Sequence, residues 1–285
     1  MGPEGEALGQ PGEMTRAMPM PATDQAVPRF GAVIEDSMAA SPIVLVCEHA
    51  SNHFPALWGD LGLDAAAQVA HIAWDPGALW LARGVARRLG ACLVHAPVSR
   101  LVYDLNRAPD QEGAMPARSE IYDIPGNVAL SPAARATRTQ AIYTPFHSDL
   151  RAELNRRAAA GPAPVVITVH SFTPIWHGTP RAVQFGVIHD ADERLARAIV
   201  AEAGTMGLTT ALNAPYSAMD GVTHTLKVQA TPYGLLNAML EVRNDLIATP
   251  EAAEAIADLL APVLARAVAS LTGAQVAPSS HAIGA

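Results

Sequence analysis

Three apolar runs of the sequence end in residues that could bind a metal ion or transfer a proton. The run IVLV precedes His49, VVITV precedes His170, and AML precedes Glu241. A fourth segment, HIAWDPG, places Asp75 just before an expected helix. A zinc ion takes nitrogen and carboxylate ligands at about 2.0–2.2 Å and can keep one position for water. His49, Asp75 and His170 are therefore candidate metal ligands, and Glu241 is the candidate base that accepts the proton of water.

Each of these residues also has a purely structural interpretation. A single histidine at a strand end is more often hydrogen-bonded within a loop, and Asp75 before Pro-Gly suits a helix N-cap. Glu241 could pair with Arg243 at a sheet edge. Two histidines after two separate buried strands, together with a buried glutamate, favour a metal site, but the residues alone leave both interpretations open.

A second polar segment, SRLVYDLNR, contains Arg100, Asn106 and Arg107. Arginine binds carboxylates with two parallel hydrogen bonds, so these residues in an acidic protein suggest an anionic substrate or an oxyanion to be stabilised. The alternative is an ordinary salt bridge to Asp104 or Asp110.

The loop NAPYSAMDGVTH supplies two further candidates, Tyr216 and His224. Long loops in compact domains are usually functional or disordered, and the tyrosine and proline favour an ordered loop that faces a substrate. His224 could bind the substrate or only pack there. The sequence has no H-E-x-x-H, P-loop, G-x-S-x-G or G-x-G-x-x-G motif, which argues against a serine hydrolase and a nucleotide-binding enzyme.

Short apolar strands alternate with helices in the elements that must hold these residues. We expect strands at Pro42–Val46, Cys92–Val94, Val165–Val169, Ala182–Ile188 and Ala238–Val242, and helices at Gly77–Leu89, Ser131–Arg157, Asp192–Ala203 and Pro250–Leu271. This order predicts an α/β fold with a largely parallel sheet covered on both faces. In such sheets the functional residues usually lie in loops at the carboxyl ends of the strands.

Composition and charge argue against several other functional classes. The chain has 285 residues, half of them hydrophobic, a net charge of -8 and a pI of about 5.6, which argues against binding of nucleic acid or an anionic membrane surface. Two cysteines, Cys47 and Cys92, cannot build a disulfide framework. No uninterrupted apolar run reaches about 20 residues and no signal peptide is visible, so we expect a cytoplasmic protein.

The sequence also predicts how the chain is divided. Residues 1–38 are expected to be a mobile arm, 39–272 one catalytic domain and 273–285 a loose tail.

Seven stretches match one known family in order between Ile43 and Ile247. They are CEHASNHFP, HIAWDPGA, SRLVYDLNR, IYDIPGN, TVHSFTP, NAPYSAMDGVTHTL and LEVRNDL. The sequence thereby resembles the N-formylglutamate amidohydrolase family. The resemblance implies hydrolysis of the N-acyl amide of an acidic amino acid, typically N-formyl-L-glutamate to formate and L-glutamate, late in histidine breakdown. It also implies a three-layer α/β/α sandwich with a mixed, mainly parallel sheet, similar to the zinc carboxypeptidases.

Local similarity to the carboxypeptidases implies roles for single residues. Asp104-Leu105-Asn106-Arg107 is similar to their D-L-N-R segment, where Asn and Arg hold a substrate carboxylate, and Glu241 resembles their general base. Where the carboxypeptidases have the ligand motif H-x-x-E, this sequence has His49-Ala50-Ser51-Asn52. Neutral Asn52 is a poor ligand for zinc. We therefore expect Asp75 to supply the carboxylate, with Asn52 beside the metal site or in contact with the substrate.

The resulting hypothesis is a Zn²⁺ ion held by His49, Asp75 and His170, with Glu241 and Arg100 as the catalytic side chains. The expected substrate contacts are Asn52, Asn106, Arg107, Tyr216, His224 and Arg243. The partner is a small anionic N-acyl amino acid, bound by a monomer or a small homo-oligomer. Two alternatives stay open: a zinc hydrolase of another N-acyl amino acid or peptide, and a binding protein of the same fold without catalysis.

Overall fold

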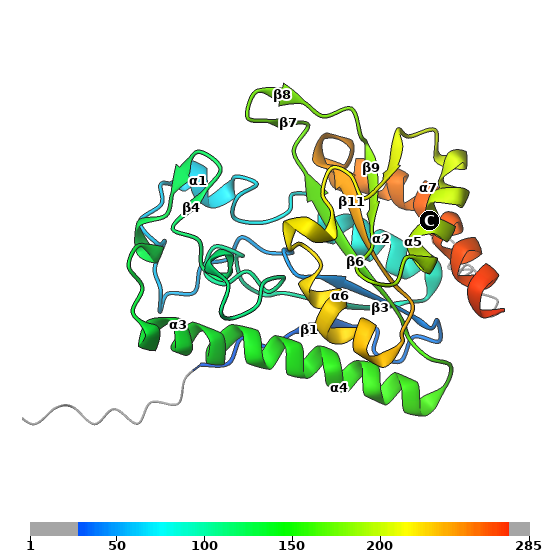
Figure 1. Cartoon of the computed structure of the whole chain (residues 1–285), viewed down its shortest axis with the longest axis horizontal. Helices are drawn as coiled ribbons and strands as arrows, with labels where there is room; N and C mark the ends of the chain where they lie inside the picture. Colours follow the sequence, from blue (N-terminus) through cyan, green and yellow to red (C-terminus); the bar gives the residue numbers. More distant parts are fainter. Residues whose placement is uncertain (1–27, 274–285) are drawn as a thin grey trace, which may run out of the picture.

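A seven-stranded mixed sheet forms the centre of the computed structural model, which describes residues 28–273 (Figure 1). Its strands are β1 (Val33–Glu35), β2 (Ile43–Cys47), β3 (Cys92–His95), β6 (Val165–Phe172), β9 (Phe185–Ile188), β10 (Thr210–Leu212) and β11 (Asn237–Arg243). They lie in the order β1-β3-β2-β6-β11-β9-β10. Strands β3, β2, β6 and β11 are parallel to one another, and β9 is parallel to β10. Within this sheet of the described residues, the β1–β3 and β11–β9 pairs are antiparallel, so the expected mixed, mainly parallel sheet is confirmed.

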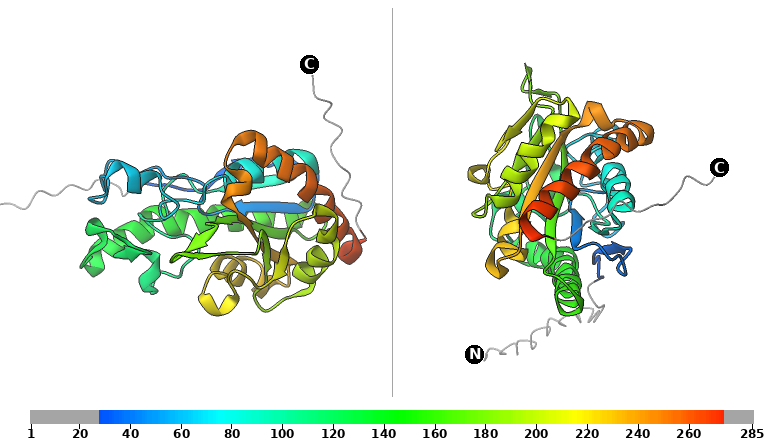
Figure 2. Two further views of the ribbon diagram at one scale, coloured as in Figure 1. Left: turned by 90° about the horizontal axis from the view of Figure 1, so that it is seen from above. Right: turned by 90° about the vertical axis from the view of Figure 1, so that its right-hand side faces the viewer.

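Helices cover both faces of the sheet, which gives the expected three layers (Figure 2). The α-helices are α1 (Ala65–Val69), α2 (Ala78–Leu89), α3 (Pro132–Arg138), α4 (Thr144–Ala160), α5 (Arg194–Glu202), α6 (His224–Gln229) and α7 (Pro250–Thr272). One core cluster joins α2, α5 and α7 to one face of the sheet. The other joins α4, α6 and the long segment after β3 to the opposite face. Central strands are thus buried on both sides, which is why β2 is an unbroken apolar run.

The predicted helices and strands are found within a few residues of their expected bounds, with one notable exception. The predicted helix Ser131–Arg157 is interrupted: α3 and α4 are separated by a π-helical turn at Thr139–Tyr143. Pro145 lies in the first turn of α4, where its ring and missing N–H are incompatible with an unbroken upstream helix. At the end of this turn, the hydroxyl of Tyr143 lies 2.9 Å from Nε2 of His224.

Part of the segment predicted as an arm, residues 1–38, forms a strand. Val33–Glu35 is β1, which pairs with β3 at the edge of the sheet. Its two apolar residues, Val33 and Ile34, are exposed, and three residues are too few to show a strand period, so only its pairing with β3 makes it a strand. The parts of the predicted arm and tail at residues 1–27 and 274–285 lie outside the described residues.

Helix α7 is long and apolar enough to cross a membrane by length and composition. In this fold it packs instead against α2 and α5, and nine of its residues are buried in the core. Its apolar composition therefore reflects its position in the centre of one helical layer.

Two small hairpins extend beyond the carboxyl ends of the central strands. One is formed by β7 (Ile175–Trp176) and β8 (Thr179–Pro180), which directly follow β6 and project from the body of the protein (Figure 1). The other is formed by β4 (Arg118–Ser119) and β5 (Tyr122–Asp123), within the long segment after β3. Both hairpins lie outside the sheet and enlarge the end at which the candidate site is found.

Candidate metal centre and active site

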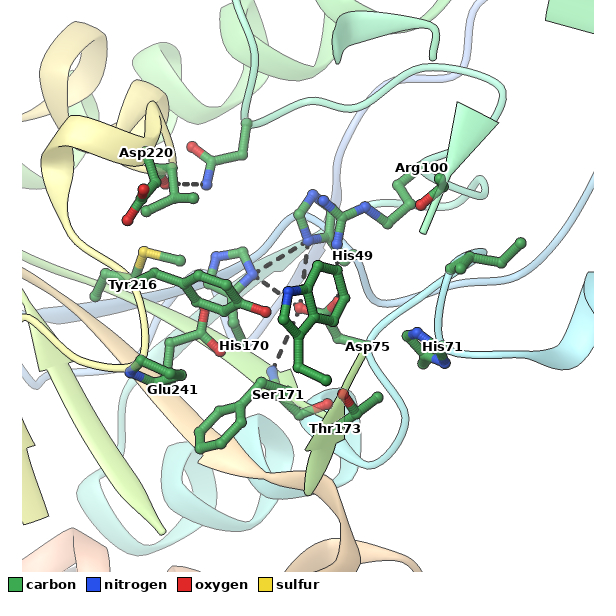
Figure 3. A pocket seen from close by; sticks show the side chains of 18 of the residues that line it. His49, His71, Asp75, Arg100, His170, Ser171, Thr173, Tyr216, Asp220 and Glu241 are labelled. Atoms are coloured by element: carbon green, nitrogen blue, oxygen red, sulfur yellow. Dashed lines mark hydrogen bonds and ion pairs between the residues drawn. The ribbon is translucent and has the colours of Figure 1, made fainter. Parts of the chain in front are cut away.

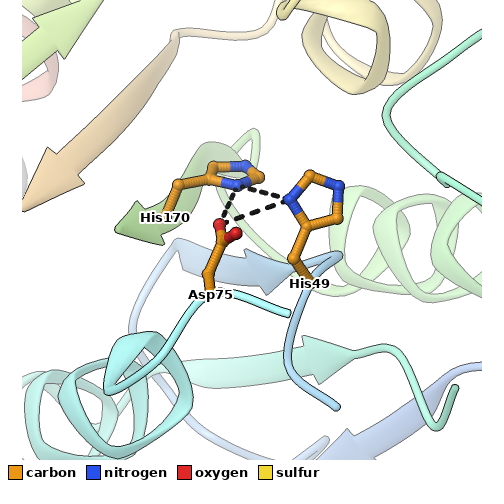
Figure 4. A group of neighbouring side chains, drawn as sticks. All are labelled: His49, Asp75 and His170. Atoms are coloured by element: carbon orange, nitrogen blue, oxygen red, sulfur yellow. Dashed lines mark hydrogen bonds and ion pairs between the residues drawn. The ribbon is translucent and has the colours of Figure 1, made fainter. Parts of the chain in front are cut away.

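The three predicted metal ligands come together although 121 positions separate the first from the last (Figure 4). His49 follows β2, His170 lies in β6, and Asp75 lies just before α2. The Nδ1 atoms of His49 and His170 are 3.2 Å apart. Each lies close to Oδ2 of Asp75, at 3.3 Å for His49 and 2.9 Å for His170. All three residues are buried.

These distances suit a divalent metal ion. A tetrahedral ion with bonds of about 2.0–2.1 Å keeps its ligand atoms about 3.3–3.4 Å apart, close to the three separations found here. The surroundings of the histidines point the same way, because Nε2 of each ring faces a carboxylate, which can only accept a hydrogen bond. In the neutral rings, the Nδ1 atoms of His49 and His170, which lie beside each other and beside the Asp75 oxygen, are then the atoms left to bind a cation. A bound cation would satisfy all three atoms at once.

Two buried carboxylates orient the histidine rings. Nε2 of His49 donates to Oδ1 of Asp104 over 2.8 Å. Nε2 of His170 lies 3.3 Å from Oε2 of Glu48, an ion-pair distance without hydrogen-bond geometry. Such carboxylate–histidine pairs fix the ring and make its free nitrogen a stronger metal ligand.

Arg100 connects the metal ligands to the pocket wall. Its guanidinium lies 3.2 Å from Oδ1 of Asp75 and donates to Oδ2 of Asp104 over 2.7 Å. The salt bridge to Asp104 that the sequence left open is therefore present, but it is partly buried and joined to the site. Burial alone would raise the pKa of Asp75, yet His49, His170 and Arg100 hold that pKa below its ordinary value.

Glu241 lies on β11, opposite His170 in the parallel register of the sheet. Its side chain is buried, and its Oε2 atom has no hydrogen-bond partner within the described chain. Burial, with the nearby charge of Asp75, raises the pKa of Glu241 to about 7. The alternative pairing with Arg243 is absent, because that guanidinium binds Asp245 and a backbone carbonyl.

A pocket of about 700 Å³ opens above these residues (Figure 3). Of the predicted site residues, His49, Asp75, Arg100, Asn106, Arg107, His170, Tyr216 and Glu241 line it. Asp75 is not the N-cap of α2, since Gly77 occupies that position and Asp75 accepts from Ser171 N over 3.3 Å. Asn106 lines the pocket, but its amide already contacts the carbonyl of Val222 and the Thr225 N–H.

Three predicted substrate residues do not line this pocket. The amide of Asn52 donates to the carbonyl of Gln68 over 3.2 Å. His224 begins α6, contacts Tyr143, and lines a separate cavity of about 240 Å³. Arg243 is engaged by Asp245 and by the carbonyl of Arg181.

Other residues line the pocket that the sequence pattern did not single out. They include His71, Trp176 and Arg181. His71 Nε2 lies 2.7 Å from Glu120, and Arg181 lies on the chain just after β8. In the sequence these residues are marked only by lying in or near the quoted motifs. Such a position does not predict the direction in which a side chain of a hairpin or loop points.

Comparisons with known proteins identify the family of this chain. The profile of the N-formylglutamate amidohydrolase family matches residues 41–248. A solved structure of an Agrobacterium tumefaciens gene product is similar at 48% identity and a TM-score of 0.83, covering 85% of this chain and 96% of that one. The N-formylglutamate amidohydrolase of Ralstonia eutropha JMP134 shares the fold at 20% identity and a TM-score of 0.63, covering 87% and 100%. A search of curated protein sequences finds no significant match.

The family profile spans every residue of the metal cluster, both carboxylates behind it and Glu241. The chain therefore belongs to the N-formylglutamate amidohydrolase family and is an amidohydrolase that acts on linear amides.

Proposed function

We propose that this protein is a zinc-dependent hydrolase of the amide bond in N-acyl acidic amino acids, with N-formyl-L-glutamate as its substrate. The observation that carries the proposal is the convergence of three possible ligand atoms, from His49, Asp75 and His170, in the pocket that also holds Glu241. The Oε2 atom of Glu241 is buried and has no hydrogen-bond partner among the described residues. This combination suits metal-assisted hydrolysis.

The donor set of two imidazoles and one carboxylate is typical of catalytic zinc. When bound, the ion supplies Lewis acidity, which lowers the pKa of water and polarises a carbonyl oxygen at this position. Zinc is favoured over magnesium because imidazole nitrogen suits zinc, whereas magnesium prefers oxygen ligands.

Glu241 is the group of this chain that moves the proton. It accepts a proton from the attacking water, whose oxygen forms the new bond to the formyl carbon. The carbon–nitrogen bond then breaks, and Glu241 delivers the proton to the leaving amine, which gives formate and L-glutamate. Because one water is consumed and no electrons are transferred, the step requires no other co-reactant.

The arginines suit the charge of this substrate. Arg100 lines the pocket beside Asp75, where it can stabilise the anionic intermediate. Arg107 lines the same pocket, and within residues 28–273 its one hydrogen bond goes to the carbonyl of Asn106, so most of its guanidinium is available for a substrate carboxylate. Hydrolysis of N-formyl-L-glutamate would place the enzyme at a late step of histidine breakdown.

The test is release of L-glutamate from N-formyl-L-glutamate by purified protein, before and after treatment with a chelator and again after zinc is restored. We expect release that is lost with the metal and returns with it. N-acetyl- and N-succinyl-L-glutamate in parallel distinguish formyl from larger acyl groups. If zinc-loaded protein released glutamate from none of these substrates, the proposal would be wrong.

A further inference from the structure

Arg181 is held in an aromatic cage at the edge of the pocket. Its guanidinium carbon lies 5.4 Å from the ring centre of Phe172, 4.9 Å from that of Trp176 and 5.0 Å from that of Tyr216. One of its nitrogens donates to the hydroxyl of Tyr216 over 3.1 Å, and another reaches the carbonyl of Thr173 over 3.4 Å. All five residues line the same pocket.

The charge of Arg181 is not neutralised. Among the described residues it has no ion pair with a carboxylate, and its hydrogen bonds go to a hydroxyl and a carbonyl. Arg107 is the other pocket arginine without a carboxylate partner, since Arg100 is matched by Asp75 and Asp104. A protein of net charge -8 thus presents two uncompensated guanidinium groups to one cavity.

The two groups enter the pocket from different segments of the chain. Arg107 belongs to the segment that carries Arg100 and Asp104, both of which contact metal-ligand side chains. Arg181 contacts no metal ligand, and it enters the pocket from the end of the β7–β8 hairpin. The aromatic rings fix the plane of its guanidinium in advance, so less freedom is lost when it binds an anion.

We infer that Arg181 is the specificity residue that binds the side-chain carboxylate of the substrate, while Arg107 binds the carboxylate next to the amide. This inference rests on the proposed function and deepens it: the preferred substrates are N-acyl amino acids that carry a second carboxylate on the side chain. A neutral side chain of the same shape leaves the charge of Arg181 without an anion in the occupied pocket, so such a substrate is disfavoured.

The experiment compares N-formyl-L-glutamate with N-formyl-L-glutamine, which differs from it by an amide in place of the side-chain carboxylate. We expect wild-type kcat/KM to favour the glutamate substrate at least about 10-fold, the effect of losing a hydrogen bond to a charged group. Arg181→Gln should reduce this preference to within about threefold by lowering kcat/KM for the glutamate substrate alone. Arg181→Lys should recover part of the preference, because the charge remains but the planar group is lost.

Arg197→Gln is the matched control, since Arg197 pairs with Glu193 on the surface and should leave the preference unchanged. An equal loss on both substrates in Arg181→Gln would assign Arg181 a structural role in the hairpin and overturn the inference. An unchanged preference would overturn it as well.

Binding of L-glutamate and L-glutamine, measured by calorimetry on the zinc-loaded protein, separates this inference from the proposed function. If the protein hydrolyses the substrates but shows no preference that depends on Arg181, the proposed function is supported and the role of Arg181 is wrong. If it binds glutamate in an Arg181-dependent way but hydrolyses none of the substrates, the role of Arg181 in recognition is supported and the proposed function is wrong. Equal binding of both amino acids by the wild type contradicts the inference.

Discussion

The floor and the rim of the pocket are built in different ways. The floor consists of His49, Asp75, His170 and Glu241, which are between 1% and 4% exposed and lie on or next to the ends of central strands. The rim consists of His71, Trp176, Arg181 and Tyr216, which are partly exposed and lie on a hairpin and loops. A buried floor holds atoms at fixed separations, as metal binding requires, whereas a rim on loops can adapt to a substrate. We therefore expect changes in the floor to abolish the reaction and changes in the rim to alter its selectivity.

The largest effect is expected from loss of a floor ligand. His170→Ala removes one of three lone pairs around the ion, so the purified variant should lose its metal, and turnover should fall on the order of 10³-fold or more. Metal content by mass spectrometry and turnover of N-formyl-L-glutamate measure both effects. His53→Ala is the matched control, because His53 is exposed on the segment that carries His49. A His170→Ala protein with a full complement of tightly bound zinc would contradict the assignment of this ligand.

Glu241→Gln should separate proton transfer from metal binding within the floor. The amide has nearly the same shape but cannot accept the proton, so kcat should fall about 10²- to 10⁴-fold while zinc content stays at the wild-type level. Thermal unfolding should not be impaired, because the carboxylate removed is buried and has an oxygen without a partner. Glu251→Gln changes an exposed glutamate at the start of α7 and should leave turnover unchanged. Wild-type turnover in a zinc-loaded Glu241→Gln protein would exclude Glu241 as the base.

Two Glu–His pairs, one under the floor and one at the rim, allow a direct comparison of the two regions. Glu48 lies 3.3 Å from Nε2 of the metal ligand His170, and Glu120 lies 2.7 Å from Nε2 of His71 at the rim. Glu48→Gln should weaken zinc binding about 10- to 100-fold, because the ligand loses the carboxylate that supports it. Glu120→Gln should leave zinc affinity unchanged. Competition with a chromogenic chelator measures both affinities, and equal affinities in the two variants would mean that Glu48 does not support the metal site.

The sequence predicted the floor well and the rim poorly for a physical reason. Parallel strands end at the same edge of a sheet, so polar residues after IVLV, VVITV and AML had to meet once the strands were recognised. Glu48 was visible beside His49 but could not be assigned to His170, since that contact depends on the register of two strands. The exact side-chain directions within β7–β8 and the Tyr216 loop depend on contacts between distant segments, and no periodicity encodes them.

The same distinction explains where the predicted fold departed from the structure. Long apolar patterns such as those of β2 and α7 are local, and they gave nearly correct bounds. Strand β1 exists only through pairing with β3, and the π turn at Thr139–Tyr143 interrupts a pattern that otherwise continues as a helix. Asn52 illustrates the limit for single residues, because its place three positions after His49, within the same motif, did not bring it to the pocket wall.

The smallest effect is expected at the rim, from removal of one ring of the cage around Arg181. Trp176→Ala leaves Phe172 and Tyr216 in place, and a cation–π contact at a partly exposed site contributes about 0.5–1 kcal/mol, or about two- to fivefold. We expect kcat/KM for N-formyl-L-glutamate to fall by that factor through KM, with kcat and zinc content unchanged. Ile175→Ala is the matched control, since Ile175 precedes Trp176 in the hairpin, is 54% exposed and does not line the pocket. A loss of zinc or a large fall in kcat in Trp176→Ala would show that rim and floor are coupled, and the division between recognition and chemistry would then be wrong.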